Sequence, residues 1–371
     1  MSKRFGLLIL LIFSGQCLFA QRYLSLSAGP GNTLAHHEEI NAIKGNPFIM
    51  RLDYAAKLQG RAYHERLGNP LSGLSLTFID HGDPSTGRSY ALSTFLQPTI
   101  ISGKRHALSG RMSVGAAYIE KPFDEARNPL QFAIGSHLNF FVETHLVYEA
   151  KLSERWGMHL QGGILHLSNA AARQPNAGLN ILTASVGTTY QLSSEGKPAL
   201  AFLNRKDLIT ETKTWQHFLD VSIGMKTVNR LGDSLYRAIG ASYNAQYRYG
   251  VLSSLLVGLD VDYNEGYIAE RAYLNIQRGE GNEVPFKEVR WAMLLGHEFH
   301  LNRVSLVMQM GRYIVLPFNA HSRYFQRYGL RYYPSDKLYV SATLRTHAAK
   351  ADYMEWSIGY RLFKKSKATQ N

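Results

Sequence analysis

The sequence predicts an all-β protein, a transmembrane antiparallel β-barrel of about sixteen strands. Three observations support this prediction: an N-terminal export signal, alternation of apolar and polar residues with a period of two, and an abundance of tyrosine, phenylalanine and glycine (22, 17 and 32 residues). Alternation over segments of about ten residues is the pattern of membrane barrels. In an exported chain, only a closed barrel lets strands cross lipid with every backbone group hydrogen-bonded.

Residues 1–20 have the layout of a secretory signal peptide. Lys3 and Arg4 precede an apolar run over residues 7–13, which small and polar residues follow. This run is too short to span a bilayer, because a transmembrane helix needs ~20 apolar residues. We expect cleavage after residue 20 and export of the remaining chain to the cell outer membrane. The single cysteine, Cys17, lies inside this segment, so the exported chain has no thiol for disulfides or thiolate metal sites.

The formal net charge of +13 argues against one class of partner. Five of the positive charges lie near the ends of the chain, in Lys3, Arg4, Lys364, Lys365 and Lys367. The others are scattered, and no basic block is interleaved with aromatic residues as on a nucleic-acid-binding surface. We therefore expect no nucleic-acid partner. The excess of Lys and Arg suits either lipid phosphates or ordinary solvated charge.

Three segments show the alternation most clearly. In residues 156–168 the even positions carry Trp, Met, Leu and Ile, whereas the odd positions include His and Gln. Residues 180–192 alternate Leu, Ala, Val and Tyr with Thr, Ser and Gln, and residues 354–362 alternate Met, Trp, Ile, Tyr and Leu with Glu, Ser, Gly and Arg. Alternation alone also fits a soluble barrel with an apolar interior. The signal peptide, the aromatic strand ends and the number of strands favour the membrane barrel.

The same pattern, followed along the chain, predicts two sets of eight strands. Short turns such as 101–106 and 300–302 belong on the periplasmic side, and long segments such as 119–134 and 265–287 belong outside. The predicted strands lie near residues 22–29, 47–58, 72–79, 88–101, 106–119, 134–151, 154–168, 178–192, 215–226, 235–250, 252–264, 288–300, 302–315, 322–332, 336–346 and 352–363.

One long connection, residues 194–214, separates the two sets. It follows a first strand set at 21–193 and precedes a second at 215–363, after which residues 364–371 form a tail. Both sets end in similar sequences, SVGTTYQL and WSIGYRLF. One sixteen-stranded barrel and two eight-stranded barrels both fit this organisation, and we favour the single barrel.

The stretch HLSNAAARQPNAGLN, residues 166–180, carries the residues suited to chemistry. His166 and Ser168 are two apart on a strand, so both side chains leave from one face, which is the apolar one. The ten residues from Trp156 to His166 climb roughly 23 Å, about the height of the apolar band. The pair therefore lies at the outer rim, pointing towards lipid. Asn180 begins the next strand with matching parity, and we expect the hairpin loop to fold it back beside His166.

A Ser-His-Asn cluster in this position has the parts of an esterase. His166 can take the proton from Ser168, which makes the hydroxyl a nucleophile towards an ester carbonyl. Asn180 can hold the imidazole in the required tautomer. Oxyanion donors are available from the backbone N–H groups at 169–171 or from the amides of Asn169 and Asn176. The alternative is an ordinary aromatic-girdle position, where His166 and Ser168 only meet lipid headgroups.

Residues 166–180 resemble the active-site hairpin of the outer-membrane lipid A 3-O-deacylase (acyloxyacyl hydrolase-like) family. That pattern is H-x-S-N-A, then P-N-x-G, then an acidic residue twelve positions after the serine. The matching residues are His166, Ser168, Asn169, Ala170, Pro175, Asn176 and Gly178. The resemblance spans roughly residues 22–193, with nothing comparable in the second half. It implies that Ser168 is the nucleophile, His166 the general base and Asn180 the orienting residue.

Asn180 departs from this family, which has glutamate there. Losing the carboxylate weakens stabilisation of the imidazolium, which implies lower activity or a different acyl donor. The His-Ser-Asn set, with Asn169 after the serine, also resembles outer-membrane phospholipase A, a calcium-dependent barrel esterase. The intervening P-N-x-G pattern does not belong to that second family.

Other polar residues have simpler explanations. The odd positions of strand 134–151 point into the lumen, and a polar, hydrated interior explains them better than a metal or proton site. These positions include His137, Asn139, Glu143, His145 and Glu149. His36 and His37 have no third ligand at a suitable spacing, so we expect no zinc site.

The leading hypothesis is a serine esterase that removes an ester-linked acyl chain from lipid A in the outer leaflet. For this reaction we expect no cofactor. The first alternative is a phospholipase A that uses the same residues on phospholipid, with calcium as its cofactor. The second is a non-enzymatic, porin-like or structural barrel. The sequence predicts no oligomeric state.

Overall fold

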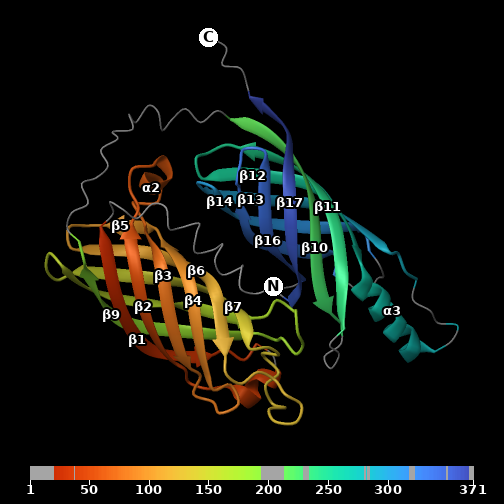
Figure 1. Ribbon diagram of the computed structural model, residues 1–371, viewed down its shortest axis with the longest axis horizontal. Helices are drawn as coiled ribbons and strands as arrows, with labels where there is room; N and C mark the ends of the chain where they lie inside the picture. Colours follow the sequence, from red (N-terminus) through yellow and green to blue (C-terminus); the bar gives the residue numbers. More distant parts are fainter. Residues whose placement is uncertain are drawn as a thin grey trace. The chain divides into compact units, whose positions relative to one another are not determined.

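The computed structural model describes residues 21–36, 38–193, 213–228, 234–279, 281, 285–316, 322–347 and 350–366. These residues form two closed antiparallel β-barrels (Figure 1). The predicted signal peptide, His37, residues 194–212 of the predicted linker and residues 367–371 of the predicted tail lie outside the described residues.

The first barrel contains nine strands and two short helical segments. These are β1 (Arg22–Thr33), the 3-10 helix η2 (Glu38–Ile43), β2 (Phe48–Lys57), α2 (Ala62–Arg66), β3 (Leu71–Asp80), β4 (Arg88–Gln97), β5 (Thr99–Ser102), β6 (His106–Ile119), β7 (Leu138–Lys151), β8 (Trp156–Ser168) and β9 (Leu179–Gln191). The second barrel contains eight strands and one helix. These are β10 (Thr214–Thr227), β11 (Leu235–Arg248), β12 (Ser253–Asn264), α3 (Glu265–Arg278), β13 (Val289–Leu301), β14 (Val304–Val315), β15 (Tyr324–Tyr332), β16 (Leu338–His347) and β17 (Lys350–Ser366).

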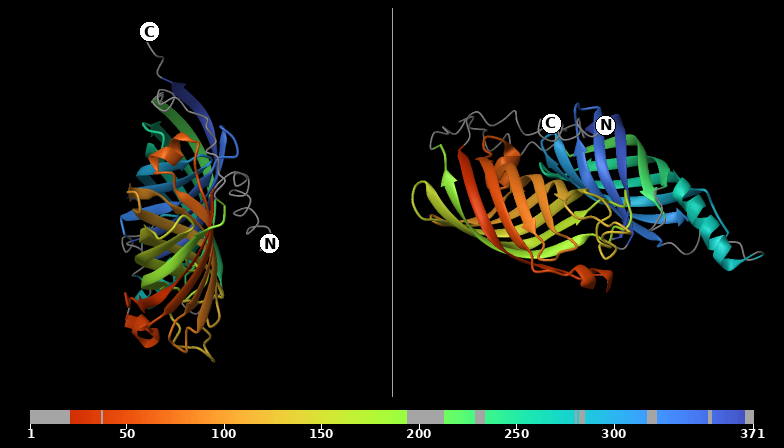
Figure 2. Two further views of the ribbon diagram at one scale, coloured as in Figure 1. Left: turned by 90° about the vertical axis from the view of Figure 1, so that its left-hand side faces the viewer. Right: turned by 60° about the horizontal axis from the view of Figure 1, so that its bottom comes forward.

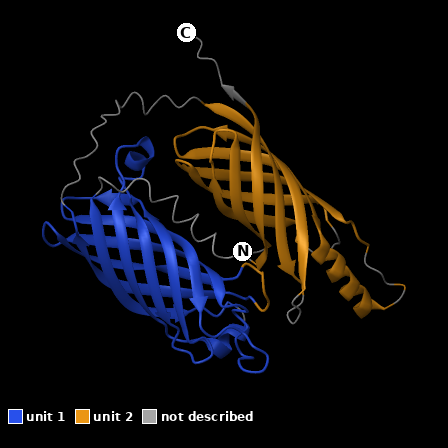
Figure 3. Ribbon diagram, in the orientation of Figure 1, with its two compact units in different colours: residues 1–169, 176–205 blue, residues 170–175, 206–371 orange. Residues whose placement is uncertain are grey.

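The partner of strand β9 decides the architecture. Strand β9 pairs with β1, with Leu24 opposite Tyr190, and β4 pairs with β6, so the first eight-stranded ring closes on itself. Strand β10 pairs with β17 and closes the second ring. Each ring forms its own compact unit (Figures 2 and 3). The all-β fold class is confirmed, but the favoured single barrel is wrong. A single barrel would need β9 to pair with β10, whereas the free edge of β9 is hydrogen-bonded to β1.

The predicted strand at 88–101 is divided into β4 and β5 at Pro98. Proline has no N–H to donate to a ladder, so it interrupts a strand at the point where it occurs. Pairing with β6 resumes in β5, where Ile101 lies opposite Leu108. The ring therefore has eight crossing strands, and β5 continues the fourth of them.

Apolar side chains cover the outside of both barrels, and polar side chains fill much of the inside. On β8, Leu160 is 58% exposed, whereas the neighbouring Gln161 is 3% exposed. On β13, Met293 is 58% exposed and Arg290 is 2% exposed. This distribution is the reverse of a soluble barrel and is stable where the outer surface meets lipid. Among the described residues, no helix combines the length and apolar character needed to cross a bilayer.

The lumen of the first barrel contains an ion-pair network, as the polar-interior interpretation of strand 134–151 predicted. Glu143 on β7 is paired with Arg51 and Arg111. Arg111 also donates two hydrogen bonds to Asp53, at 2.8 and 2.9 Å. These pairs neutralise one another inside the barrel, where an isolated charge would be costly. His137 is an exception, because β7 begins only at Leu138 and the His137 ring lies 2.8 Å from the Ile119 carbonyl oxygen.

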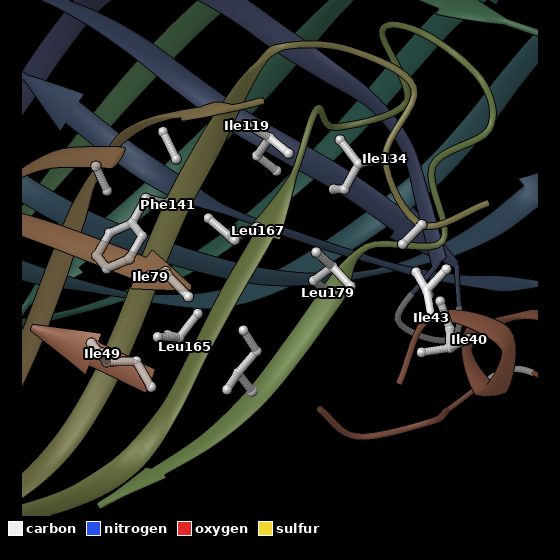
Figure 4. Close-up of a cluster of buried hydrophobic side chains, with 14 residues drawn as sticks. Ile40, Ile43, Ile49, Ile79, Ile119, Ile134, Phe141, Leu165, Leu167 and Leu179 are labelled. Carbon is white, nitrogen blue, oxygen red and sulfur yellow. The ribbon is translucent and has the colours of Figure 1, made fainter. Parts of the chain in front are cut away.

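This polar lumen does not extend over the whole height of the first barrel. At the end that carries the β8–β9 hairpin loop, the inward residues of both strands are apolar and at most 1% exposed: Leu165, Leu167, Leu179 and Ile181. Ile40 and Ile43 of η2 join the same cluster (Figure 4). The hairpin is therefore held on its inner face by a hydrophobic core, which fixes the direction of its outward side chains.

The lumen of the second barrel is filled by a larger charged network. Arg345 reaches Asp260 at 2.7 Å and Asp262 at 2.9 Å, and Arg327 reaches Asp260 at 2.9 Å. A cavity of about 10 Å³ lies beside Asp220 and Arg327. That volume holds about one water molecule.

The segment 265–287, predicted as a long loop, contains helix α3. Asn264 caps its N-terminus, where the side chain accepts a hydrogen bond from the Gly266 N–H at 2.9 Å. Tyr267 in its first turn is buried and packs against Leu274 and Phe286. The loop prediction is corrected here, because a cap residue and apolar contacts stabilise a helix that strand periodicity does not reveal.

Candidate active site

The β8–β9 hairpin brings the three predicted side chains together. His166 on β8 lies directly opposite Asn180 on β9 in the ladder. Ser168 is two residues beyond His166 and lies opposite Phe140 on β7. Directly paired residues share a face of the sheet, so all three polar groups emerge on the outward face.

Two hydrogen bonds join these groups into a chain. His166 Nδ1 lies 2.7 Å from Asn180 Oδ1, and His166 Nε2 lies 3.0 Å from Ser168 Oγ. A carboxamide oxygen only accepts, so Nδ1 carries the ring proton and donates it to Asn180. The lone pair of Nε2 then faces the Ser168 hydroxyl, which is the arrangement a general base requires.

The exposure of the outward-facing side chains decreases along strand β8 towards the hairpin loop. Leu160 is 58% exposed on the outward face, whereas Ser168 is 7% exposed. The sequence predicted that Ser168 points towards lipid at the outer rim. It lies on the predicted face of the strand, but the residue is buried. Its cross-strand neighbours on β7 are apolar and more open, with Phe140 37% and Val142 45% exposed. An acyl chain would meet these two side chains beside the hydroxyl.

The two proposed oxyanion residues differ in their contacts. The backbone N–H of Asn169 donates to Asn176 Oδ1 at 3.0 Å, and Asn169 Nδ2 donates to Ser136 Oγ at 3.0 Å. Both the backbone N–H and the side-chain amide of Asn169 therefore donate to other loop residues. Asn176 Oδ1 is thereby fixed, while its Nδ2 has no hydrogen-bond partner among the described residues. Asn176 is therefore the stronger candidate for a donor to an oxyanion.

Residues 170 and 171, whose backbone N–H groups were also suggested as donors, have an unusual conformation. Ala170 and Ala171 have φ of 55° and 62°, in the left-handed region that alanine rarely adopts. Such strained residues cluster at functional sites, where the surrounding structure holds them in place.

Gly178 makes a close approach to the catalytic candidate His166. Its φ is +79°, and a Cβ atom at this position would lie 2.8 Å from His166 Cε1. Its N–H donates to the Ala133 carbonyl oxygen at 2.9 Å, which fixes the loop. In the sequence Gly178 stands out only as the glycine of the P-N-x-G pattern, whereas the structure shows that the imidazole needs the absence of a side chain here.

We expect Gly178→Ala to lower kcat by about 10²-fold, because the added methyl group must push the imidazole away from Ser168. The measurement is ester hydrolysis by the purified, folded variant. Gly87→Ala is the matched control: its φ of +67° is equally left-handed, but the nearest atoms are those of the flexible Lys121 side chain at 3.3 Å. Equal activity of the two variants would contradict the proposed packing.

One neighbour of the site was missed by sequence reasoning, which considered His36 only as a zinc ligand. His36 lies in the loop after β1, and its Nδ1 is 3.2 Å from Asn180 Nδ2. The two residues are 144 positions apart, so no local motif links them. Only the β1–β9 pairing, which closes the barrel, brings them together.

The chain matches several solved outer-membrane protein structures at low sequence identity. Neisserial surface protein A is 11% identical, with 46% of this chain and 96% of that chain covered and a TM-score of 0.31. The outer membrane protein Omp33 of Acinetobacter baumannii is 8% identical, with 93% and 100% covered and a TM-score of 0.18. The toluene transporter TodX of P. putida is also 8% identical, with 93% and 90% covered and a TM-score of 0.18. No curated protein sequence matches the chain.

Two family models match successive parts of the chain. Residues 52–189 match lipid A 3-O-deacylase (PagL), and residues 215–365 match the C-terminal domain of acyloxyacyl hydrolase. The expectation that the second half has no counterpart in this family is therefore wrong. Each match lies within one of the two barrels, and the first includes His166, Ser168 and Asn180. The chain belongs to the lipid A 3-O-deacylase (acyloxyacyl hydrolase) family.

Proposed function

We propose that the protein is a serine esterase of the outer membrane that removes an ester-linked acyl chain from lipid A in the outer leaflet. The observation that carries this proposal is the hydrogen-bond chain from Ser168 through His166 to Asn180 on the outward face of the first barrel. Family membership supports lipid A as the substrate. The apolar outer surface supports a membrane location, because such a surface is stable in lipid.

In the proposed reaction, Ser168 Oγ attacks the ester carbonyl carbon while His166 Nε2 takes the hydroxyl proton. The carbonyl oxygen becomes an oxyanion, and Asn176 Nδ2 is the proposed donor to it. When the intermediate collapses, the bond to the lipid A oxygen breaks and His166 returns its proton to that oxygen. A water molecule then attacks the acyl-enzyme, with His166 again as the base, and releases the fatty acid.

Asn180 holds the imidazole but supplies no charge. Its Oδ1 accepts from Nδ1, which keeps the lone pair on Nε2. A glutamate in that place would also stabilise the imidazolium electrostatically, as a carboxylate does in serine hydrolases. We therefore expect slower turnover from this enzyme than from a relative with glutamate there.

The substrate is proposed to approach from the lipid. Ser168 shares its face with Phe140 and Val142, and this face carries the exposed apolar residues of the barrel. The inner face behind the site is closed by the apolar side chains of Leu165, Leu167, Leu179 and Ile181, and ion pairs occupy the lumen further along the barrel. The filled lumen of the second barrel, with its cavity of about 10 Å³ beside Asp220, also disfavours a porin-like channel there.

Mass spectrometry of lipid A tests the proposal. Cells expressing the wild-type protein should lose one acyl chain from lipid A, and cells expressing Ser168→Ala should not. Ser102→Ala, an exposed serine at the opposite end of the same barrel, should behave as wild type. Fatty acid released from phospholipid and abolished by a chelator would indicate the phospholipase alternative. No lipid difference between wild type and Ser168→Ala would contradict both enzymatic hypotheses.

A further inference from the structure

We infer that His36 is a positioning residue that orients the Asn180 carboxamide for the proposed reaction. The inference rests on the proposed function, since it concerns the same Ser168 and His166. A carboxamide has an oxygen end and an NH₂ end, and only the oxygen end can accept the proton of His166 Nδ1. Something must therefore determine which end faces His166.

The contacts of His36 determine its tautomer. Its Nε2 lies 3.0 Å from the Ala177 carbonyl oxygen, which needs a donor. Its Nδ1 lies 3.2 Å from the Leu34 carbonyl oxygen, a longer contact to an oxygen that also accepts the His36 backbone N–H at 3.1 Å, so we assign the single ring proton to Nε2. A neutral His36 ring therefore carries its proton on Nε2 and presents a lone pair at Nδ1.

The lone pair at His36 Nδ1 faces Asn180 Nδ2 at 3.2 Å. Only the NH₂ end of the carboxamide can donate to it, so Oδ1 is left pointing to His166 Nδ1, 2.7 Å away. If the carboxamide turned over, its oxygen would face the His36 lone pair and its NH₂ group would face a ring N–H. His36 therefore favours the productive orientation at both ends of the group.

The loop that carries His36 is fixed to the same strand as its partner. The Leu34 N–H donates to the Asn180 carbonyl oxygen at 2.8 Å. After His36, the buried side chains of Ile40 and Ile43 anchor η2 in the hydrophobic core. The position of the imidazole relative to Asn180 is thus set by backbone pairing on one side and by core packing on the other.

Two substitutions of equal shape test the inference. In His36→Asn the carboxamide oxygen can take the place of Nδ1 as acceptor, whereas His36→Leu has no acceptor. We expect His36→Leu to lower kcat roughly fivefold with little change in KM, the factor that corresponds to one net hydrogen bond of about 1 kcal/mol. His36→Asn should keep most of the activity. The assay is hydrolysis of purified lipid A in detergent micelles by the full exported chain.

The same two substitutions in an Asn180→Asp background show whether His36 acts by orienting the carboxamide or only by supporting the local structure. A carboxylate has two equivalent oxygens and needs no orienting partner, so His36→Leu should cost little there. Equal kcat for His36→Leu and His36→Asn, or an equal loss of kcat in both backgrounds, would overturn the inference. In either case the proposed function stands if Ser168→Ala abolishes hydrolysis. If Ser168→Ala hydrolysed lipid A at the wild-type rate, the proposed function itself would be refuted.

Discussion

Replacing Ser168 by alanine is expected to lower the rate of lipid A hydrolysis by at least about 10³-fold, the largest effect of any single substitution. The alanine removes the attacking oxygen and leaves His166 Nε2 without the hydroxyl it contacts at 3.0 Å. Residual hydrolysis would come only from binding and oxyanion contacts. The measurement is kcat for purified enzyme with lipid A in micelles.

The fold must be unchanged for this result to have meaning. Ser168→Ala should give the same β-sheet circular dichroism and melting temperature as wild type, because it deletes one oxygen at the barrel rim. Ser102→Ala should retain full kcat. Activity of Ser168→Ala within tenfold of wild type would contradict its role as nucleophile.

The second large effect is expected from Asn180→Ala, which should lower kcat by about 10²-fold or more. Without the Asn180 oxygen, nothing in the described site holds the ring proton on Nδ1, and the tautomer with its proton on Nε2 cannot accept from Ser168. Asn180→Asp keeps an acceptor and adds a charge, so it should retain or exceed wild-type kcat. Steady-state kinetics of both variants measure this difference.

The difference in kcat between Asn180→Ala and Asn180→Asp tests the role of Asn180. If Asn180→Ala retained wild-type kcat, the 2.7 Å contact to His166 would be structural only. If Asn180→Asp lost as much activity as Asn180→Ala, the acceptor would not be the relevant property of the residue. The first outcome would remove Asn180 from the mechanism, and the second would require a specific role for the carboxamide.

The sequence was sufficient for the hairpin because its geometry is local. The spacing of two between His166 and Ser168 places them on one face, and the parity of Asn180 within the next strand places its side chain on the same face. The structure has them in the predicted order and on the predicted face. Their catalytic roles remain a proposal.

The sequence was insufficient to predict features that depend on contacts between residues far apart in the chain. Alternation defines strands but does not say which strand closes on which, so the β1–β9 pairing belonged to one of two alternatives and not to the favoured one. The same pairing brings His36 to Asn180. The apolar core behind the hairpin was missed for a related reason: Leu165 and Leu167 face inward, where a polar lumen was expected, and they pack against distant loops.

The most direct test of a nucleophilic Ser168 is covalent labelling with an alkyl fluorophosphonate, followed by mass spectrometry of the peptides. The serine attacks phosphorus, fluoride leaves, and a stable adduct remains on the attacking oxygen. The proposed mechanism predicts one adduct, on Ser168, with labelling strongly slowed in His166→Phe. An active protein that stays unlabelled at Ser168, or that carries its adduct on a different residue, would contradict it.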